Sequence, residues 1–495
     1  MAIEEHKRSQ EPSYFCLLCV GVGIHQASKK QHRVFAAMRQ SLAAVIALAS
    51  VAQASLQIVP GATWTVENTG EHLQAHGAGI IEVDGTYYII GEDKTNGSSF
   101  QNINCYSSTN LVEWSYVGAL LTLQSSGDLG PDRVVERPKV IYNDDTSTYV
   151  MYMHIDDSSY GEAEVGVATS SSVCGSYEYQ GSFQPLDHQS RDINLFKDDD
   201  GTGYLLTEDR ENGLRIEKLS SDYLSVENNT YLFSNSDLGI EAPAMIKLDG
   251  TYYLFGSRLT GWDPNDNYYT TATSLSGPWS DWAIFVDEGS NTYDSQTNFV
   301  LAIQGSSSTT AVYFGDRWHS DALFSSTYVW LPLTIDGTSV SMKNQVNWII
   351  DTATGEWSAG PSETEYEGEA ATLSNNASSI SCDGCSGGDA AGYIGGDSAP
   401  GGTATFSSVS SEASTTTTIR IKYQNLDSTA RYAAVTVNGE EVGTQVAFLP
   451  TTQGTPGSSV INVALTEGDS NEIVIAGVEG KGYGPDVDRL MVPST

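Results

Sequence analysis

Positive charge is scarce in this sequence. Its 495 residues include 24 lysines and arginines against 62 aspartates and glutamates, a formal net charge of −38. Such a chain repels phosphate backbones and anionic lipid surfaces, so we expect neither nucleic acid nor a membrane as a partner. The charge suits a protein acting on neutral material, although solubility alone accounts for it equally well.

Long apolar runs are also missing. The run within residues 41–54 has about a dozen apolar residues, too few to span a bilayer. It follows Met38-Arg39-Gln40 and closes on Ala52-Gln53-Ala54, the pattern of a secretory signal peptide. We therefore predict a signal peptide over residues 38–54, a gene-model extension over residues 1–37, and a secreted, extracellular protein.

Cysteine is rare, and only Cys105, Cys174, Cys382 and Cys385 follow the predicted signal peptide. An even number in a secreted chain favours disulfides. Cys382 and Cys385 are close enough in sequence to pair locally or to bind a metal. The lack of a nearby histidine or second cysteine pair argues against zinc.

Helical periodicity is absent, whereas 48 glycines and 26 tyrosines suit strands and turns. One hairpin pattern recurs five times: a polar residue, an apolar strand, a turn and a tyrosine-rich strand. The fourth copy turns at Leu248-Asp249-Gly250. Repeated hairpins at this spacing indicate one four-stranded blade per repeat, so we predict an all-β chain with a five-bladed β-propeller over residues 55–357.

The polar residues that open the repeats follow one another at intervals of 60, 56, 49 and 55 residues: His76, Glu136, Asp192, Glu241 and Gln296. The first strand of each blade lines the axis of a propeller, so these side chains should converge there. A single polar opener would only start a strand. Five of five, three of them acids, favour a shared polar funnel.

A second domain follows a predicted linker over residues 358–365. Residues 366–495 alternate short strands with glycine and serine turns, which is typical of a β-sandwich, and we predict a jelly-roll. Glu367 and Glu369 alternate and therefore share a strand face, and Asp488 lies near the other end of the domain. Carboxylates brought together there would suit Ca²⁺, although their spacing alone fits ordinary surface acids better.

Several motifs resemble glycoside hydrolase family 43. Ser190-Arg191-Asp192 and Glu241-Ala242-Pro243 resemble the family as a whole, and three other segments look like its exo-β-1,3-galactanase branch: His76-Gly-Ala-Gly, Glu136-Arg-Pro-Lys and Tyr293-Asp-Ser-Gln296. The resemblance implies a monomeric inverting enzyme that needs no cofactor for catalysis. It would release galactose from β-1,3-galactan, the backbone of arabinogalactan.

The resemblance also implies roles for two acids. Glu241 would be the general acid that protonates the leaving oxygen, which requires a raised pKa. Asp192 would orient Glu241 and raise that pKa through its negative charge.

The base is less clear, because most of the family has an aspartate where this chain has His76. The resemblance makes Gln296 the residue that positions the attacking water, as an amide or its imidic tautomer, and Glu136 a substrate-binding residue. On chemistry alone, Glu136 is the easier base.

Other residues are candidates for substrate binding because of their position in the sequence. Trp262, Trp318 and Tyr160 follow strands near the openers, where aromatic rings stack on sugars, although packing is the commoner role of such rings. His76 and Asp316 complete the predicted substrate-binding set.

The C-terminal segments Tyr366-Glu-Gly-Glu369 and Gly482-Tyr-Gly-Pro-Asp-Val-Asp-Arg489 resemble a carbohydrate-binding module of family 35. The resemblance makes Glu367, Glu369 and Asp488 ligands of a structural Ca²⁺. Tyr393 and Tyr483 are candidates for sugar contact.

Two other functions stay open. An arabinofuranosidase or xylosidase on the same scaffold should have an aspartate in place of His76. A non-catalytic carbohydrate-binding protein would account for the missing base, but it would have no need for both Glu241 and Asp192.

Overall fold

The structure is a computed structural model that describes residues 56–236, 238–397 and 400–494. The predicted gene-model extension and signal peptide lie outside these residues. The described chain is almost entirely β-structure, with one four-residue helix, α2 (Asn291–Asp294), and three short 3₁₀ turns, η1 (Pro185–Asp187), η2 (Leu323–Ser325) and η3 (Ser386–Gly388). Among the described residues, none of the helices reaches the length and apolarity that a transmembrane span requires.

Five four-stranded antiparallel sheets, here called blades 1 to 5, follow one another along the chain. Blade 1 contains β2 (His76–Val83), β3 (Thr86–Glu92), β4 (Asn102–Ser108) and β5 (Ser115–Thr122). Blade 2 contains β6 (Arg133–Asn143), β7 (Thr148–Asp157), β8 (Glu164–Ser170) and β9 (Glu178–Phe183). Blade 3 contains β10 (Ile193–Lys197), β11 (Gly203–Asp209), β12 (Gly213–Leu219) and β13 (Val226–Ser234).

Blades 4 and 5 have the same organisation. Blade 4 contains β14 (Ile240–Leu248), β15 (Thr251–Arg258), β16 (Tyr268–Ala272) and β17 (Ala283–Ile284). Blade 5 contains β18 (Gln296–Gln304), β19 (Thr309–Arg317), β20 (Thr327–Asp336) and β21 (Ser339–Met342). A separate hairpin, β22 (Trp348–Asp351) with β23 (Glu356–Ala359), follows blade 5.

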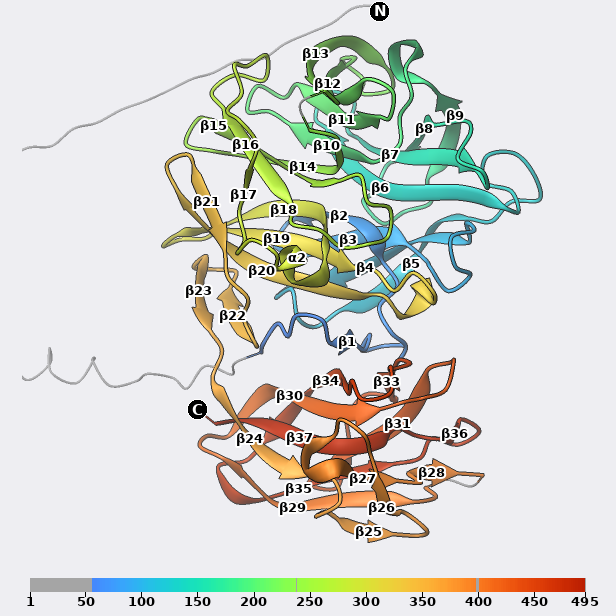
Figure 1. Cartoon of the computed structure of the whole chain (residues 1–495), viewed down its shortest axis with the longest axis vertical. Helices are drawn as coiled ribbons and strands as arrows, with labels where there is room; N and C mark the ends of the chain where they lie inside the picture. Colours follow the sequence, from blue (N-terminus) through green and yellow to red (C-terminus); the bar gives the residue numbers. More distant parts are fainter. Residues whose placement is uncertain (1–55, 237, 398–399, 495) are drawn as a thin grey trace, which may run out of the picture. The chain divides into compact units, whose positions relative to one another are not determined.

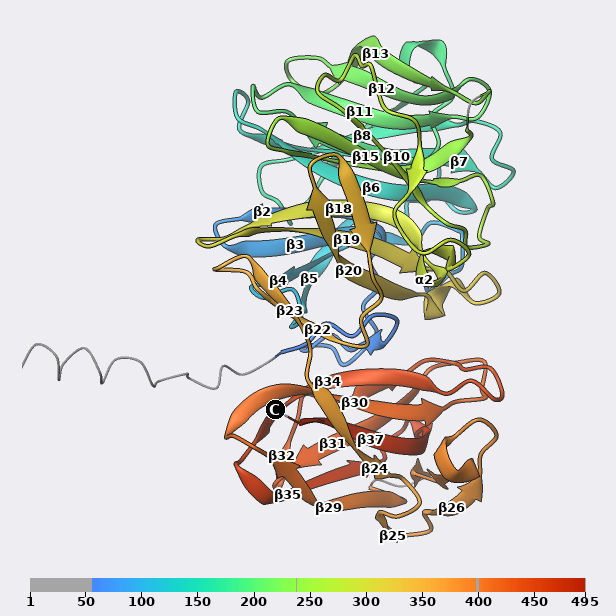
Figure 2. The same cartoon turned by 60° about the vertical axis from the view of Figure 1, so that its left-hand side comes forward.

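The first strands of the blades form a ring. Strand β2 contacts β6, β6 contacts β10, β10 contacts β14, β14 contacts β18, and β18 contacts β2. Figure 1 and Figure 2 both show yellow β18 beside blue β2, where the ring closes. These contacts give the arrangement that the five hairpin repeats predict, with the openers at the inner strands.

A β-bulge directly follows the opener in three blades. The strand register shifts after His76 in β2, after Glu136 in β6 and after Glu241 in β14. The residue after each opener, Gly77, Arg137 or Ala242, has a left-handed backbone with φ of 55°, 51° or 52°. A bulge increases the local twist and turns the opener out of the regular strand alternation.

The C-terminal domain consists of two main sheets that share one apolar core. The first sheet runs β1-β34-β30-β37-β27-β26 with β24 beside β37, and the second runs β25-β29-β35-β31-β32 with β33 beside β31. Their core draws on both sheets, with Ile421 and Leu490 from the first and Phe406 and Ile475 from the second. The jelly-roll connectivity remains a prediction.

The strands of this domain are short and separated by turns. They are β24 (Ser362–Glu367), β25 (Thr372–Ser374), β26 (Ser378–Ser381), β27 (Asp389–Gly392), β28 (Gly395–Gly396), β29 (Thr403–Ser411), β30 (Thr415–Gln424), β31 (Arg431–Val437), β32 (Glu440–Glu441), β33 (Val446–Phe448), β34 (Gly457–Leu465), β35 (Gly468–Ala476), β36 (Gly482–Tyr483) and β37 (Asp486–Ser494). Strand β24 begins inside the predicted linker, because residues 362–365 pair with β37.

The boundary at the other end of the propeller also differs from the prediction. Strand β1 (Thr63–Trp64) lies within the predicted propeller segment, yet it pairs with β34 of the C-terminal sheet. The two disulfides are Cys105–Cys174, which joins blades 1 and 2, and Cys382–Cys385, which closes locally. Both pairs agree with the disulfide interpretation of the cysteines.

Candidate active site

One cavity collects most of the site residues that are predicted in the propeller. It has a volume of about 290 Å³, at the lower end of the range for pockets that hold a small organic ligand. Seven predicted residues line it: Glu136, Tyr160, Asp192, Glu241, Trp262, Gln296 and Trp318. They come from blades 2 to 5, so the folded ring, and not sequence proximity, brings them together.

Glu241 is buried, with 5% of its surface exposed, and is bound by two donors. The Gln296 amide nitrogen donates to its Oε1 over 3.1 Å, and the Arg210 guanidinium donates to its Oε2 over 3.2 Å. Burial, followed by the negative charge of Asp192, raises the pKa of Glu241 to about 8, against the opposing charges of Arg137 and Arg210. A carboxyl group that keeps its proton near neutral pH is suited to general acid catalysis.

Asp192 binds the backbone that carries Glu241. Its Oδ2 accepts a 3.0 Å hydrogen bond from the Ala242 N–H, the bulge residue next to Glu241, and its Oδ1 lies 2.8 Å from the Arg137 Nε. Asp192 therefore acts on Glu241 in two ways, because it fixes the bulge and places a negative charge beside the acid.

This bulge contact recurs around the ring. The Arg137 N–H donates to Glu92 Oε1 and the Gly77 N–H donates to Asp316 Oδ2, both over 2.8 Å. In each case the carboxylate comes from the preceding blade. The bulges are thus positioned by acids of neighbouring blades, and this explains several buried carboxylates around the axis.

Gln296 has partners for all four hydrogen-bonding positions of its amide. Its oxygen accepts from Arg137 Nη2 over 2.6 Å and from the Trp318 indole over 2.9 Å, while its nitrogen donates to Glu241 and to Ser257 Oγ. Arginine and indole nitrogens only donate, so the amide orientation is fixed. An imidic O–H at this oxygen would face two donors, and a water nucleophile would have to replace one of the present partners.

Glu136 lies among positive and hydroxyl groups. Its Oε1 is 3.3 Å from Lys94 Nζ and accepts from the Tyr160 hydroxyl over 3.1 Å, and its Oε2 is 3.4 Å from His154 Nδ1. Burial alone would raise the pKa of Glu136, but Lys94 and His154 hold it well below its usual range. Such a carboxylate is a good acceptor for sugar hydroxyls and a weak base.

The aromatic wall consists of Trp262 and Trp318. Their rings are 5.0 Å apart in an edge-to-face arrangement, and Lys94 Nζ lies 5.8 Å from the Trp262 ring. Both indoles line the cavity, so they offer apolar surface to a sugar ring beside the charged groups.

His76 and Asp316 lie beneath this cavity and not in its lining. Their exposed fractions are 0% and 1%, the His76 Nδ1 is 3.3 Å from Asp316 Oδ1, and the His76 ring stacks on Tyr328. Asp316 does line a smaller pocket together with Trp262, Gln296 and Trp318. Contact of His76 or Asp316 with a sugar remains a prediction.

Five residues of the cavity were missed by sequence reasoning: Glu92, Arg137, His154, Arg191 and Arg210. His154 is buried between Glu136 and Asp156; burial opposes its charge, but hydrogen bonds to these two carboxylates raise its pKa to about 9. Arg137 directly follows the opener Glu136, and this position in the sequence could have identified it as a site residue. Nothing local marks Glu92 or Arg210, which stand at or just after the ends of second strands.

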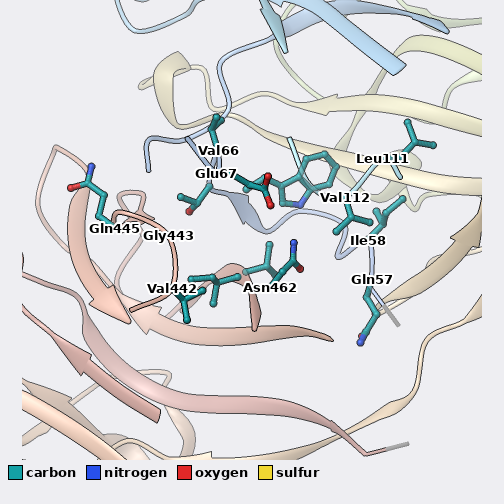
Figure 3. A pocket seen from close by; sticks show the side chains of 14 residues that line it. Gln57, Ile58, Val66, Glu67, Leu111, Val112, Val442, Gly443, Gln445 and Asn462 are labelled. Carbon is teal, nitrogen blue, oxygen red and sulfur yellow. The ribbon is translucent and has the colours of Figure 1, made fainter. Parts of the chain in front are cut away.

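A second cavity is lined by residues within 57–67, by Leu111 and Val112 of blade 1, and by residues within 442–462 of the C-terminal domain (Figure 3). Ile58, Leu111, Val112 and Val442 give it a largely apolar lining, and Glu67 is the one acid among its lining residues. It holds no candidate catalytic pair, so the chemistry belongs to the ring cavity.

Comparisons with known proteins identify the family of the chain. The family model described as glycosyl hydrolases family 43 matches residues 74–298. The solved exo-β-1,3-galactanase from Phanerochaete chrysosporium with galactose is 36% identical, and the alignment covers 88% of this chain and 99% of that chain with a TM-score of 0.61. The chain belongs to glycosyl hydrolase family 43. It is therefore a glycoside hydrolase.

Two further solved structures are also similar to this family 43 hydrolase. A putative exo-β-1,3-galactanase from Bifidobacterium bifidum is 39% identical over 58% of this chain and 97% of that chain, with a TM-score of 0.56. An exo-β-1,3-galactanase from Clostridium thermocellum, 24% identical over 87% and 99% of the two chains with a TM-score of 0.58, shares the fold. No curated protein matches the chain.

The C-terminal domain of the family 43 hydrolase matches a different module from the one predicted. The family model described as the CBM13 domain of alpha-galactosidase covers residues 403–492. The family 35 assignment rested on one motif outside this match, at residues 366–369, and one inside it, at residues 482–489, and the comparisons do not show that family. Tyr393 and Tyr483 are half-exposed, with ring centroids 6.0 Å apart.

The predicted calcium ligands lie close to Ser386. Its backbone N–H donates to Asp488 Oδ1 and its hydroxyl donates to Glu367 Oε1, both over 2.8 Å. The other oxygens, Glu367 Oε2, Glu369 Oε2 and Asp488 Oδ2, are buried without a hydrogen-bond partner, although Arg489 Nε lies 3.4 Å from the last. These hard oxygens fit Ca²⁺ in chemistry, whereas in the described residues no group of three or more such side chains is arranged as a metal centre.

Proposed function

We propose that this family 43 hydrolase is a secreted exo-β-1,3-galactanase that releases galactose from β-1,3-galactan with inversion. The observation that carries the proposal is the Glu241–Gln296 pair in a small cavity. In this pair, the Glu241 carboxyl is suited to donate a proton, and the Gln296 amide stands where an inverting enzyme would ordinarily have a carboxylate base. The likeness to galactanases over nearly the whole of their chains supports the substrate class.

In the proposed reaction, Glu241 gives its proton to the glycosidic oxygen as the bond from that oxygen to the anomeric carbon breaks. A water molecule adds its oxygen to that carbon from the opposite face and gives one proton to solvent, from which the Glu241 carboxylate is reprotonated. Gln296 positions this water once the sugar has displaced one of its amide partners. Glu136 binds sugar hydroxyls, because its depressed pKa makes it a poor proton acceptor.

The small volume of the cavity supports attack at a chain end. The lining of charged groups on one side and two indoles on the other suits a single terminal pyranose, with hydroxyls toward Glu136 and Tyr160 and an apolar face toward Trp262 or Trp318. Galactose release should therefore proceed one residue at a time.

The deciding experiment is incubation with β-1,3-galactotriose and, in parallel, with aryl arabinofuranoside and xyloside. We expect free galactose from the first, formed as the α-anomer when followed by NMR at early times, and no product from the other two. Glu241→Gln, which is nearly isosteric, should abolish release. Release of arabinose or xylose would favour the other glycosidase class, and binding without any product would contradict the enzyme proposal.

We further propose that Glu367, Glu369 and Asp488 hold a structural Ca²⁺ in the C-terminal domain. Calcium should raise the melting temperature of the protein and EDTA should lower it, whereas Asp488→Asn should lose this response. Identical melting curves with calcium and with EDTA would remove the ion from the proposal.

A further inference from the structure

Three carboxylates and two guanidinium groups meet at one wall of the ring cavity. Asp192 pairs with Arg137, whose Nε lies 2.8 Å from Oδ1. Glu208 pairs with Arg210 through Nε at 2.6 Å and Nη2 at 3.3 Å. Glu241 is the remaining carboxylate, so the group is electrically neutral when it holds one proton.

The hydrogen-bond partners of Glu241 respond differently to that proton. Its Oε1 accepts from the Gln296 amide and its Oε2 accepts from Arg210, so both oxygens face donors. A protonated carboxyl keeps acceptor lone pairs, so it can still accept from the uncharged Gln296 amide. The charge-assisted contact with Arg210 is the one that loses most of its strength when Glu241 becomes neutral.

Arg210 is the donor that is able to leave. Gln296 has three further hydrogen bonds, to Arg137, Trp318 and Ser257. The Arg210 side chain is 46% exposed and already has its shortest contact with the buried Glu208. Its departure from Glu241 therefore breaks a single 3.2 Å contact and leaves a complete ion pair behind.

We propose that Arg210 alternates between two carboxylates, binding Glu241 while that group is ionised and withdrawing onto Glu208 when Glu241 takes up a proton from solvent. The acidic proton then sits on Oε2, and the leaving oxygen of the substrate takes the place that Arg210 vacates. Arg210 and Glu208 are positioning residues, since they act through Glu241. The proposal rests on the acid role of Glu241 given under the proposed function, and it holds for any glycoside that the enzyme cleaves.

The charged groups that face Glu241 come from three elements. Asp192 precedes β10, Glu208 and Arg210 lie at the end of β11, and Arg137 lies in β6. Strands β15 and β18 contribute the uncharged Ser257 and Gln296. Burial and Asp192 raise the pKa of Glu241, and the two arginines oppose the rise, so removing either charge of the Glu208–Arg210 pair should change the balance.

The test is the pH dependence of kcat/KM, whose alkaline limb reports the free-enzyme pKa of the general acid. Arg210→Gln should move this limb up by about one pH unit, because a positive charge beside Glu241 is lost. Glu208→Gln should move it down by a similar amount, because Arg210 is left with Glu241 as its charged partner. The double variant should return the limb close to its wild-type position.

Arg191→Gln is the matched control, since the Arg191 side chain also lines the cavity but bonds to Asp156 and the Tyr160 carbonyl, and its charge affects Glu208 less than that of Arg210 does. It should leave the alkaline limb in place, whatever it does to turnover. Melting curves of all variants show whether each is folded. Single variants whose limbs do not move, or move in the same direction, would overturn the proposal.

The failure of the acid role itself would look different. An active Glu241→Gln variant would remove the proposed acid, whereas an inactive one with unmoved limbs in the Arg210 and Glu208 variants would remove only the alternation.

Discussion

At the scale of single residues, the environment of Gln296 constrains the reaction most directly. A free amide could hold a water molecule from either end, but here Arg137, Trp318, Glu241 and Ser257 occupy all of its positions. Gln296 therefore holds Glu241 in the free enzyme, and its proposed contact with the attacking water requires that substrate binding rearrange the site.

Replacing this amide tests both of its proposed roles, which are to hold Glu241 and to position the attacking water. Gln296→Ala should lower kcat by about 10² or more, the usual cost of a lost polar group that stabilises the reaction. The measurement is initial galactose release from β-1,3-galactotriose, with Glu136→Gln assayed beside it. Near-normal turnover by Gln296→Ala, together with an inactive Glu136→Gln, would transfer the role of base to Glu136.

Glu217 is a buried carboxyl away from the reaction. It lies in β12 with 0% of its surface exposed, and within the described residues neither oxygen has a hydrogen-bond partner. Burial raises its pKa from 4.5 to about 8, against the opposing charge of Arg215. The folded protein thus keeps a proton there that the unfolded chain releases above pH 4.5.

This difference makes the stability depend on pH in a defined direction. The contribution of Glu217 is complete below pH 4.5 and is lost at about 1.4 kcal/mol per pH unit as the pH rises toward 8. Glu217→Gln cannot ionise, so its free energy of unfolding should gain on that of the wild type between pH 5 and pH 8. Urea titrations at several pH values measure this, with the exposed Glu178→Gln as control; parallel curves for Glu217→Gln and wild type would contradict it.

At the scale of elements, the bulges after the openers connect the fold to the site. A left-handed residue in the first strand turns the opener toward the axis, and a side chain of the preceding blade accepts the exposed N–H. Arg137 and Ala242 adopt this conformation although they are not glycines, which costs each about 1–2 kcal/mol. The ring contacts that hold the blades together offset this cost.

Gly77 offers a clean perturbation of one bulge. A Cβ at this position would lie 1.9 Å from Glu92 Oε1, the atom that accepts the Arg137 N–H. Gly77→Ala should therefore displace Glu92 and lower kcat/KM by about tenfold or more, through Arg137 and Gln296.

The hairpin of the same blade supplies the matched control. Gly85 also has a left-handed backbone, with φ of 77°, but a Cβ there meets no atom within 4 Å. Gly85→Ala should cost about 1 kcal/mol of stability and leave activity unchanged. Equal activities of the two variants would contradict a role for the Gly77 bulge in the site.

The sequence predicts the blades because their signals are local. The turn at Asp249-Gly250 and the alternation that follows Glu241 can be recognised within one repeat, and the ring geometry then gathers the openers. Arg137, Glu92 and Arg210 escape such reasoning because their place depends on bulges and on strand ends of neighbouring blades. His76 shows the converse, since its repeat is regular but the packing against Tyr328 and Asp316 covers its ring.

At the scale of the whole molecule, the two domains share structure beyond the connecting chain. The described residues belong to one compact unit, and β1, which precedes blade 1, pairs in parallel with β34 through Thr63 and Trp64. The Gln57 N–H donates to Thr418 Oγ1 over 2.9 Å. Trp64 itself packs against Tyr328 and Trp330 of blade 5, so one short segment belongs to the propeller core and pairs with the C-terminal sheet.

This shared segment predicts that the two domains unfold together. Differential scanning calorimetry of the full chain should give one transition whose calorimetric and van't Hoff enthalpies agree. Trp64→Ala should lower the temperature of that transition, because it removes the ring contacts with Tyr328 and Trp330. Trp357 is 37% exposed, so Trp357→Ala should leave the transition temperature nearly unchanged. Two separate transitions in the wild type, or a Trp64→Ala effect confined to one of them, would show that β1 only touches the C-terminal sheet and does not couple it to the propeller.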